Sequence, residues 1–368
     1  MEGGMPSPIK PFRVLCLDGG GMRGLYTGVL LQRLVQLFDL RYQEKTQDGR
    51  CPVPDIGKAF NMICGTSTGS ILACALALGV GIDQIVKLYK EKGSLIFPHP
   101  MPKNFFCWAL RHAKAPAADA VKLKETLSEV FKNITIKELY DKRGIALCIP
   151  SVNASDHKAY VFKTPHFPEK HRDNNYSLVD VCMASSSAPI FFPTARLLQP
   201  EINAEHFFVD GGLWANNPVL VGLIEALALT PKEQPVEVIS IGTCEMPTGD
   251  PVLLKPQMGI ADWKVGIGII EMSISSQAYG YSCMAEFLSK ILCSLGKDVK
   301  VIRLEESHKS NAQLSAIGLD KADKIAIGTL ENLALSDANL NHSKVINNPE
   351  EEKSKKIKDI FLNILELN

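Results

Sequence analysis

An α/β fold, with a mostly parallel sheet and helices on both of its faces, is predicted by a pattern that recurs along the chain. In residues 13–40 an apolar run, Arg-Val-Leu-Cys-Leu, meets a glycine turn and then apolar residues at helical spacing. In residues 60–78 a second apolar run meets Gly-Thr-Ser-Thr-Gly and then an Ala- and Leu-rich stretch. Strands that alternate with helices in this way build parallel sheets covered on both sides.

The remaining elements follow from the same periodicities. Residues 70–78 predict a helix that ends at Gly79, a plausible C-cap. Apolar runs of strand length predict further strands, at 145–152, 158–164, 206–209, 236–241 and 299–304.

Two parts of the chain are expected to differ in their secondary structure. Residues 12–222 should form the catalytic core. Residues 223–368 should continue it as a mainly helical region with one or two further strands, packed on that core. Within this second part, the charged run 350–359 starts a terminal amphipathic helix whose charged side is a solvated face.

Bulk composition excludes several classes of protein. Forty basic and forty acidic residues cancel, so nothing resembles the basic footprint of a DNA- or RNA-binding protein. The ten cysteines never show C-x-x-C spacing, which favours buried thiols in a reducing compartment and argues against a metal site. The start of the chain lacks the apolar segment of a signal peptide, and the longest apolar stretch is interrupted at residues 65–70. We therefore expect a cytoplasmic protein that touches the inner membrane peripherally at most.

The pentapeptide Gly-Thr-Ser-Thr-Gly at residues 65–69 has the form G-x-S-x-G, between a predicted strand and a predicted helix. In this context the pattern is typical of a nucleophile elbow, a sharp turn that exposes the serine hydroxyl. Gly65 and Gly69 would let strand and helix approach closely, and the helix dipole would favour negative charge beside Ser67. The alternative is an ordinary tight turn between a strand and a helix.

A second motif, Asp-Gly-Gly-Gly-Met-Arg-Gly at residues 18–24, also fits G-x-G-x-x-G. A dinucleotide-binding turn would need an acidic residue about 20 positions on, at the end of the next strand. Asp39 has that spacing but lies in the predicted helix, which counts against this interpretation. The other interpretation is an oxyanion hole, formed by the exposed amides of the three glycines. Arg23 could orient this loop, attract an anionic head group or serve as a structural ion-pair partner.

The third motif is Asp-Gly-Gly at residues 210–212, which follows a predicted strand. Because ligands gather at the carboxyl ends of parallel strands, we expect Asp18, Ser67 and Asp210 at one edge of the sheet. Alone, Asp210 could be a turn aspartate; beside Ser67 it becomes the candidate base. Only His308 and His342 follow it, so a triad through His308 or a direct Ser67–Asp210 dyad both stay open. In a dyad, desolvation would raise the pKa of Asp210 and make proton transfer less uphill.

These three motifs, in this order, resemble those of the patatin-like phospholipases. Residues 184–193 resemble the family's small-residue helix, residues 210–218 its Asp-Gly-Gly segment, and residues 239–243 the strand that follows. The resemblance implies a three-layer α/β/α sandwich and hydrolysis of glycerolipid esters, usually without calcium. It implies a Ser67–Asp210 dyad and an oxyanion hole from the glycine loop. The implied site residues are Ser67 and Asp210 as catalytic pair, Gly19, Gly20 and Gly21 as oxyanion hole, and Asp18, Arg23, Gly24, Gly65, Gly69, Gly211 and Gly212 in support.

A narrower resemblance concerns residues 11–27 and 96–102, which are similar to bacterial CBASS-type anti-phage effectors. Those effectors are switched on by a cyclic dinucleotide and degrade the membrane phospholipid of their own cell. The resemblance implies a cyclic dinucleotide ligand at a second site that the sequence does not locate. Rival hypotheses are an esterase that needs no activator, and a nucleotide-binding sensor with a degenerate hydrolase site.

Two segments outside the motifs are candidates for contact with lipid. Residues 95–116 combine aromatic and basic side chains among prolines, which suits a membrane-facing lid or an ordinary packed loop. Residues 265–284 could line an acyl channel, although a core helix is the expected use of so apolar a stretch. The expected partners are membrane phospholipid and a cyclic dinucleotide, with a homo-oligomer as a further hypothesis.

Overall fold

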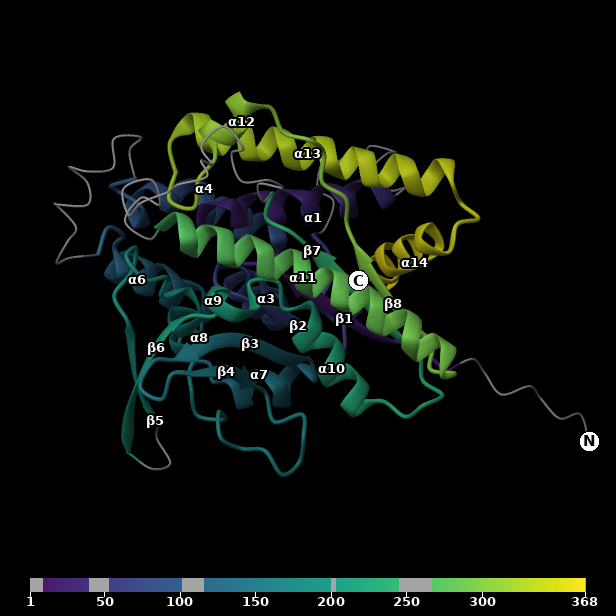
Figure 1. Ribbon diagram of the computed structural model, residues 1–368, viewed down its shortest axis with the longest axis horizontal. Coiled ribbons are helices and arrows are strands. Elements are labelled where there is room, and N and C mark those ends of the chain that lie inside the picture. Colours follow the sequence, from purple (N-terminus) through teal and green to yellow (C-terminus); the bar gives the residue numbers. More distant parts are fainter. Residues whose placement is uncertain (1–8, 40–52, 101–115, 200–202, 245–266, 368) are drawn as a thin grey trace, which may run out of the picture.

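One mixed sheet of eight strands forms the centre of the protein (Figure 1). The computed structural model describes residues 9–39, 53–100, 116–199, 203–244 and 267–367. The strands are β1 (Phe12–Leu17), β2 (Met62–Gly65), β3 (Ala146–Asn153), β4 (Lys158–Lys163), β5 (Ala195–Gln199), β6 (Ala204–Asp210), β7 (Val236–Ile241) and β8 (Val299–Arg303).

The strands lie in the order β5-β6-β3-β2-β1-β7-β8, and β4 pairs with β3 away from this path. Strands β3, β2, β1, β7 and β8 are parallel, whereas β4, β5 and β6 join in antiparallel fashion. The sheet therefore extends from one predicted part of the chain into the other, because β7 and β8 continue the parallel series that begins at β1.

Alternation along the strands divides the core between the two faces of the sheet. In β1, Leu15 and Leu17 belong to the larger apolar cluster, while Val14 and Cys16 belong to the smaller one on the opposite face. Successive side chains of a strand point to opposite faces, so a continuous apolar run is what a strand covered on both sides requires.

Helices cover both faces (Figure 1). They are α1 (Gly24–Phe38), α3 (Thr68–Leu78), α4 (Ile82–Ile96), α6 (Ala120–Phe131), α7 (Ile136–Arg143), α8 (Leu178–Ser186), α9 (Gly212–Ala215), α10 (Val219–Leu229), α11 (Ile267–Ser294), α12 (Asn311–Ala316), α13 (Lys324–Asn347) and α14 (Glu352–Glu366), with 3₁₀ turns at Gly21–Arg23 and Ile56–Ala59. The long helix α13 packs against α1, and α14 packs against both of them. On the other face, α10 and α11 pack side by side and close the smaller apolar cluster.

The predicted α/β class and mostly parallel sheet are confirmed, and the strand predicted at 236–241 has the bounds of β7. Gly79 is the C-cap of α3, with a left-handed φ of 88°. The terminal helix α14 is amphipathic as expected, because it buries Ile357, Ile360 and Phe361 between charged residues.

Two expectations about the antiparallel edge were wrong. Strand β5 was not predicted, because Leu197 is its single buried side chain and so short a run gives a weak apolar signal. Strand β6 was expected among the parallel strands but runs antiparallel to β3. In the described ranges, no helix is both long enough and apolar enough to span a lipid bilayer.

Candidate active site

The turn that carries Ser67 lies between β2 and α3, as the G-x-S-x-G pattern predicted. Ser67 is the N-cap of α3 and has φ 54° and ψ −122°, a conformation that L-residues rarely adopt. Backbone strain of this kind costs on the order of 1–3 kcal/mol and persists only where neighbouring structure enforces it. Here the Ser67 amide donates to Ser185 Oγ at 2.9 Å, and Ser185 Oγ donates to the carbonyl oxygen of Pro150 at 2.7 Å.

The glycines of the motifs allow close backbone contacts around this turn. A Cβ atom at Gly69 would overlap the carbonyl oxygens of Leu17 and Asp18, where α3 begins beside the end of β1. A Cβ at Gly211 would overlap the carbonyl oxygen of Pro150 in β3. Both positions therefore require glycine, because a larger residue would not fit. The close backbone contacts bring three strand ends near one another.

Asp210 reaches Ser67 by a different route from the one expected. Its strand, β6, runs antiparallel to β3, so the direction of β6 alone would not bring its carboxyl end to the edge where the parallel strands end. Strand β3 extends past the end of β2, and β6 pairs only with the last part of β3, from Ser151 to Asn153. Asp210, paired with Ser151, is thereby placed level with the turn that follows β2.

The Ser67 hydroxyl donates a hydrogen bond to Asp210 Oδ2 at 2.7 Å. The other carboxylate oxygen, Oδ1, accepts the Gly212 amide at 2.7 Å. Burial raises the pKa of Asp210 to about 6, although the hydrogen bonds from Ser67 and Gly212 lower it in part. This carboxylate is thus a stronger base than a solvated aspartate and is already bonded to the serine proton.

The triad alternative does not fit this geometry. Ser67 contacts Asp210 directly, and His308 is exposed in the loop that follows β8. Among the described residues that line the cavity at Ser67, none is a histidine.

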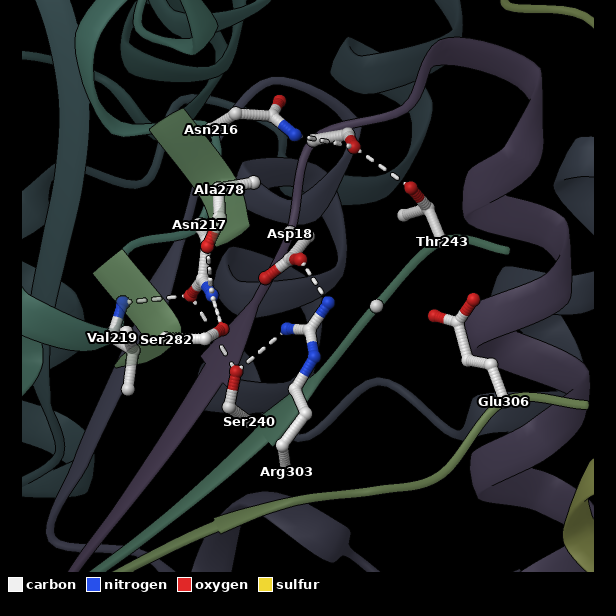
Figure 2. Close-up of polar contacts among 12 residues, drawn as sticks. Asp18, Asn216, Asn217, Val219, Ser240, Thr243, Ala278, Ser282, Arg303 and Glu306 are labelled. Carbon is white, nitrogen blue, oxygen red and sulfur yellow. Dashed lines mark hydrogen bonds and ion pairs between the residues drawn. The ribbon is translucent and has the colours of Figure 1, made fainter. Parts of the chain in front are cut away.

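The glycine loop is fixed through the peptide groups of Gly19, which bond to Asn216 and Thr243; Figure 2 labels these two partners. The Gly19 amide donates to the carbonyl oxygen of Asn216 at 3.0 Å. Its own carbonyl oxygen accepts Thr243 Oγ1 at 2.8 Å and Asn216 Nδ2 at 3.4 Å. In the part of the chain that the structure describes, the amides of Gly20 and Gly21 have no acceptor, and both residues line the cavity beside Ser67. The expectation that all three amides are available is wrong, because the single hydrogen of Gly19 is already donated.

Asp18, which begins the loop, is fully buried and paired with Arg303 (Figure 2). Arg303 Nη2 lies 2.5 Å from Asp18 Oδ2, and Nη1 donates to Ser240 Oγ at 2.8 Å. Burial raises the pKa of Asp18 to about 6, against the opposing effect of the Arg303 charge. The loop is therefore held to the end of β8 by an ion pair at its first residue.

Arg23 orients the loop, since its Nε donates to the carbonyl oxygen of Gly20 at 3.4 Å. Among the described residues it forms no ion pair, which removes the structural ion-pair interpretation within those ranges. It also lines the cavity, so the possibility of contact with an anionic group stays open. Gly24, the last motif residue, packs on Thr68 and Tyr89, where a Cβ would overlap both side chains.

A cavity of about 1170 Å³ opens at Ser67. Ser67, Asp210 and the glycine loop line it, together with charged side chains such as Arg303 and Glu305. Much of the lining is apolar and comes from several helices and the loops beside them; it includes Ile71, Ile96, Phe97, Leu123, Leu127 and Phe191. The space is large enough for a long hydrocarbon chain, such as the acyl chain of a lipid substrate.

Both segments singled out as lipid contacts border this cavity. Most of the proposed lid, residues 101–115, lies outside the described residues; Ile96 and Phe97 at its start line the cavity. Helix α11 also lines it, through Met272 and Tyr279 among others, while both of these side chains are exposed. The expectation that residues 265–284 form a core helix is therefore wrong in the described part, since only one side of α11 is buried.

A cluster away from the cavity brings together three side chains of types that can ligate a metal. Ligand atoms of Cys148, His166 and Glu225 all lie within 4.8 Å of one another. Burial lowers the pKa of His166, but hydrogen bonds to Cys148 and Glu225 outweigh it and raise that pKa to about 9. His166 Nε2 is 3.1 Å from Glu225 Oε1, and Lys163 Nζ is 2.6 Å from Oε2. Glu225 of helix α10 is thus held by ion pairs to Lys163 at the end of strand β4 and to His166 in the loop that follows it.

Comparison with known proteins identifies the family. The model of the patatin-like phospholipase family matches residues 15–223. A relative from Pseudomonas aeruginosa, a cGAMP-activated phospholipase, is 35% identical over 73% of this chain and 73% of its own length. A cUMP-AMP-activated phospholipase from Escherichia coli is 25% identical over 89% of this chain and 92% of its own. The solved structure of human GIVD cytosolic phospholipase A2 superposes with a TM-score of 0.48 at 10% identity, over 97% of this chain and 61% of that one.

The fold and the matched segments thus define a hydrolase of lipid esters. The chain belongs to the patatin-like phospholipase family, and it is an enzyme of the ester-hydrolase class.

Several residues of the site were not assigned a role from the sequence. Asn216 stands within the quoted 210–218 segment, and its Asn-Asn-Pro ending, directly after the Asp-Gly-Gly turn, was the available signal. Thr243 follows β7, at the same edge of the sheet as Asp18 and Ser67. Arg303 ends β8, but its partner lies 285 positions earlier, and nothing local in the sequence indicates that pairing.

Proposed function

We propose that this enzyme releases free fatty acid from membrane glycerophospholipids, as a phospholipase of the A type, through a Ser67–Asp210 dyad. The observation that carries the proposal is the 2.7 Å hydrogen bond from Ser67 Oγ to Asp210 Oδ2, in a cavity with apolar walls. A hydroxyl that already donates to a buried carboxylate needs little rearrangement to transfer its proton.

In the first step, Asp210 takes the proton from Ser67 as Oγ attacks the acyl carbonyl carbon. The carbonyl oxygen becomes an oxyanion, and the amides of Gly20 and Gly21 are the donors we assign to it. Each donor of this kind is typically worth about 3–4 kcal/mol in the transition state. Gly19 contributes by fixing the loop, since its amide is bonded to Asn216.

In the second step, the oxyanion collapses, the bond to the glycerol oxygen breaks and Asp210 gives the proton to that leaving oxygen. An acyl-enzyme on Ser67 remains, and the lysolipid departs. A water molecule then gives a proton to Asp210 and attacks the acyl carbon, which frees the fatty acid and restores the serine. Asp210 therefore acts first as a base, then as an acid, and then again as each in deacylation.

We further propose that a cyclic dinucleotide activates the enzyme and that the reaction acts as an anti-phage response at the inner membrane. The similarity to the cGAMP-activated and cUMP-AMP-activated relatives supports this regulation. Hydrolysis of the cell's own phospholipid would give such a response its effect.

The test is fatty acid release from phospholipid vesicles, measured by mass spectrometry with cGAMP, with cUMP-AMP and without nucleotide. We expect release by the wild type, stimulated by one of the nucleotides, and none by Ser67→Ala with unchanged circular dichroism. Release by Ser67→Ala at the wild-type rate would refute the assignment of the nucleophile. Equal release with and without either nucleotide would leave an esterase that needs no activator.

A further inference from the structure

The outward side of α11 is unusual among the surface helices of this protein. Over 28 residues the helix carries three charged side chains, Glu271, Glu286 and Lys290. The terminal helix α14, by comparison, reads Glu-Lys-Ser-Lys-Lys-Ile-Lys-Asp over its first two turns, and among these charges Glu352, Lys355, Lys358 and Asp359 are exposed. A surface helix of a globular protein normally has a polar outer face, so the outer face of α11 needs a partner of its own.

The exposed apolar side chains of α11 fall on one side of the helix. Ala278, Ala285 and Ser289 are buried and mark the side that packs on the protein. Tyr279 is 74% exposed, Phe287 66% and Ile291 55%. These three recur at spacings of eight and four, so they share a face, and this face points away from the buried side. Met272 and Met284 are exposed as well and extend the stripe, which Leu295 continues in the turn after α11.

In Figure 1, α11 crosses the front of the molecule, and no other described element lies over its outer side. At the usual rise of a helix, the part of the stripe within α11, from Met272 to Ile291, is about 30 Å long. Exposed Ser273, Ser276, Glu286 and Lys290 lie between the apolar side chains of the stripe. Even so, several large apolar side chains exposed along one helix mark an interaction site, whereas single exposed apolar residues need no explanation.

Continuity with the substrate cavity indicates what covers the stripe. Met272 and Tyr279 belong to both surfaces, because they are exposed and also line the cavity that holds Ser67. The stripe therefore begins at the rim of the cavity and runs away from it along α11. A protein partner seated here would cover that rim, whereas a bilayer would bring substrate to it.

The side chains of the stripe suit the interface of a bilayer. Tyr279 joins an apolar ring to a polar hydroxyl, as residues at the lipid–water boundary commonly do. Lys290 Nζ lies 5.6 Å from the ring centre of Phe287, so a cation accompanies the apolar side chain that would enter the lipid. A long aliphatic stem lets such a lysine keep its charge among head groups while its neighbours are buried.

We propose that the α11 stripe, from Met272 to Leu295, is the surface by which this enzyme docks on a phospholipid bilayer, with the cavity rim facing the lipid. The proposal rests on the proposed function, since it takes membrane phospholipid as the substrate. It assigns membrane contact to a helix that the sequence suggested as core.

Vesicle binding tests the surface without depending on catalysis. The protein carries Ser67→Ala, so vesicles stay intact, and binding is measured by flotation with 7:3 phosphatidylcholine:phosphatidylglycerol vesicles. Phe287→Glu with Ile291→Glu is expected to lower the partition coefficient at least about tenfold. The matched control is Val121→Glu with Ile325→Glu, whose side chains are 66% and 74% exposed on α6 and α13. The control should bind within about twofold of the parent.

A soluble ester separates failure of this proposal from failure of the proposed function. With Ser67 restored, both double variants should hydrolyse 4-nitrophenyl butyrate at the wild-type rate, while Phe287→Glu with Ile291→Glu loses activity on vesicles. Equal vesicle binding by the two double variants would overturn the docking surface, as would a parent that binds no vesicles. A wild-type dimer that becomes monomeric in Phe287→Glu with Ile291→Glu, with vesicle binding unchanged, would instead assign the stripe to a second copy of the chain. Butyrate hydrolysis by Ser67→Ala is a separate result, because it tests the proposed nucleophile and not the docking surface.

Discussion

Asp18 and Asp210 form a natural comparison, because they are alike in nearly everything except their partners. Each ends or follows a strand at the edge of the sheet where Ser67 lies, and each precedes a run of glycines, three after Asp18 and two after Asp210. Both are buried, and burial raises the pKa of each to about 6. Asp18 is paired with the Arg303 guanidinium, whereas Asp210 is bonded to neutral donors, the Ser67 hydroxyl and the Gly212 amide.

The difference shows that a raised pKa alone does not identify a general base. A guanidinium gives up no proton at physiological pH, so the Asp18–Arg303 pair can position the glycine loop but cannot start the reaction. Asp210 has a donor whose proton can be transferred. Our account thus gives one aspartate a positioning role and the other a chemical one, and each of the following measurements would separate these roles.

The largest expected effect separates the two aspartates by activity. Asp210→Asn should lower kcat/KM at least about 10³-fold, because a carboxamide cannot accept the serine proton. Asp18→Asn should lower it about tenfold or less, since the change weakens only the support of the loop. Fatty acid release from vesicles measures both. A loss as large in Asp18→Asn as in Asp210→Asn would abolish the distinction.

Removal of the Arg303 guanidinium should lower the stability of the protein. Arg303→Met leaves the Asp18 carboxyl buried without its counter-charge, and we expect the free energy of unfolding to fall by about 2–3 kcal/mol at pH 8. Without the guanidinium the pKa of Asp18 rises further, so its ionisation costs more at high pH and the loss should be smaller at pH 5. Urea unfolding at both pH values measures this. Adding Asp18→Asn should recover part of the loss; a double variant less stable than Arg303→Met would contradict the pairing.

The pH dependence of hydrolysis should follow Asp210. Protonated Asp210 cannot accept a proton, so the rate should rise through a midpoint near pH 6 and fall about tenfold for each unit below it. Since Asp18 titrates in the same range, Asp18→Asn is the informative control. Its midpoint should stay near that of the wild type. A midpoint that moves by a full unit in Asp18→Asn would make Asp18 the titrating group.

The smallest effect concerns the loop without touching either aspartate. Thr243→Val removes the hydrogen bond to the Gly19 carbonyl oxygen, and the free energy of unfolding should fall by about 1 kcal/mol. Hydrolysis should slow by less than about tenfold, because Asn216 still holds the same peptide groups. Thermal unfolding and vesicle hydrolysis measure the two effects. Unchanged stability would show that Thr243 does not support the loop.

The sequence predicted the parallel half of the sheet well and the antiparallel edge poorly. Strands covered on both faces, such as β1 and β7, read as continuous apolar runs, and the turns that follow them are marked by glycine. The direction of β6 leaves no such mark, since a strand has the same periodicity whichever way it runs. Asp210 was therefore placed beside Ser67 for a reason that the topology does not support.

Within the site, local motifs predicted Ser67, Asp210 and the glycine loop, but not what holds them. Which loop amide is already bonded depends on Asn216, nearly two hundred positions later. The exposure of α11 was likewise out of reach, because a helix that is apolar on all sides reads as core until its neighbours are known.

The central claim is that Asp210, and not Asp18, activates Ser67, and covalent labelling with a fluorophosphonate tests it most directly. The labelled peptide identifies the serine, and the initial rate of labelling at pH 8 reports its nucleophilicity. Our account predicts labelling at Ser67 in the wild type and in Asp18→Asn, and a rate at least about 10²-fold lower in Asp210→Asn. Labelling of Asp210→Asn at the wild-type rate, or of a serine other than Ser67, would contradict the dyad.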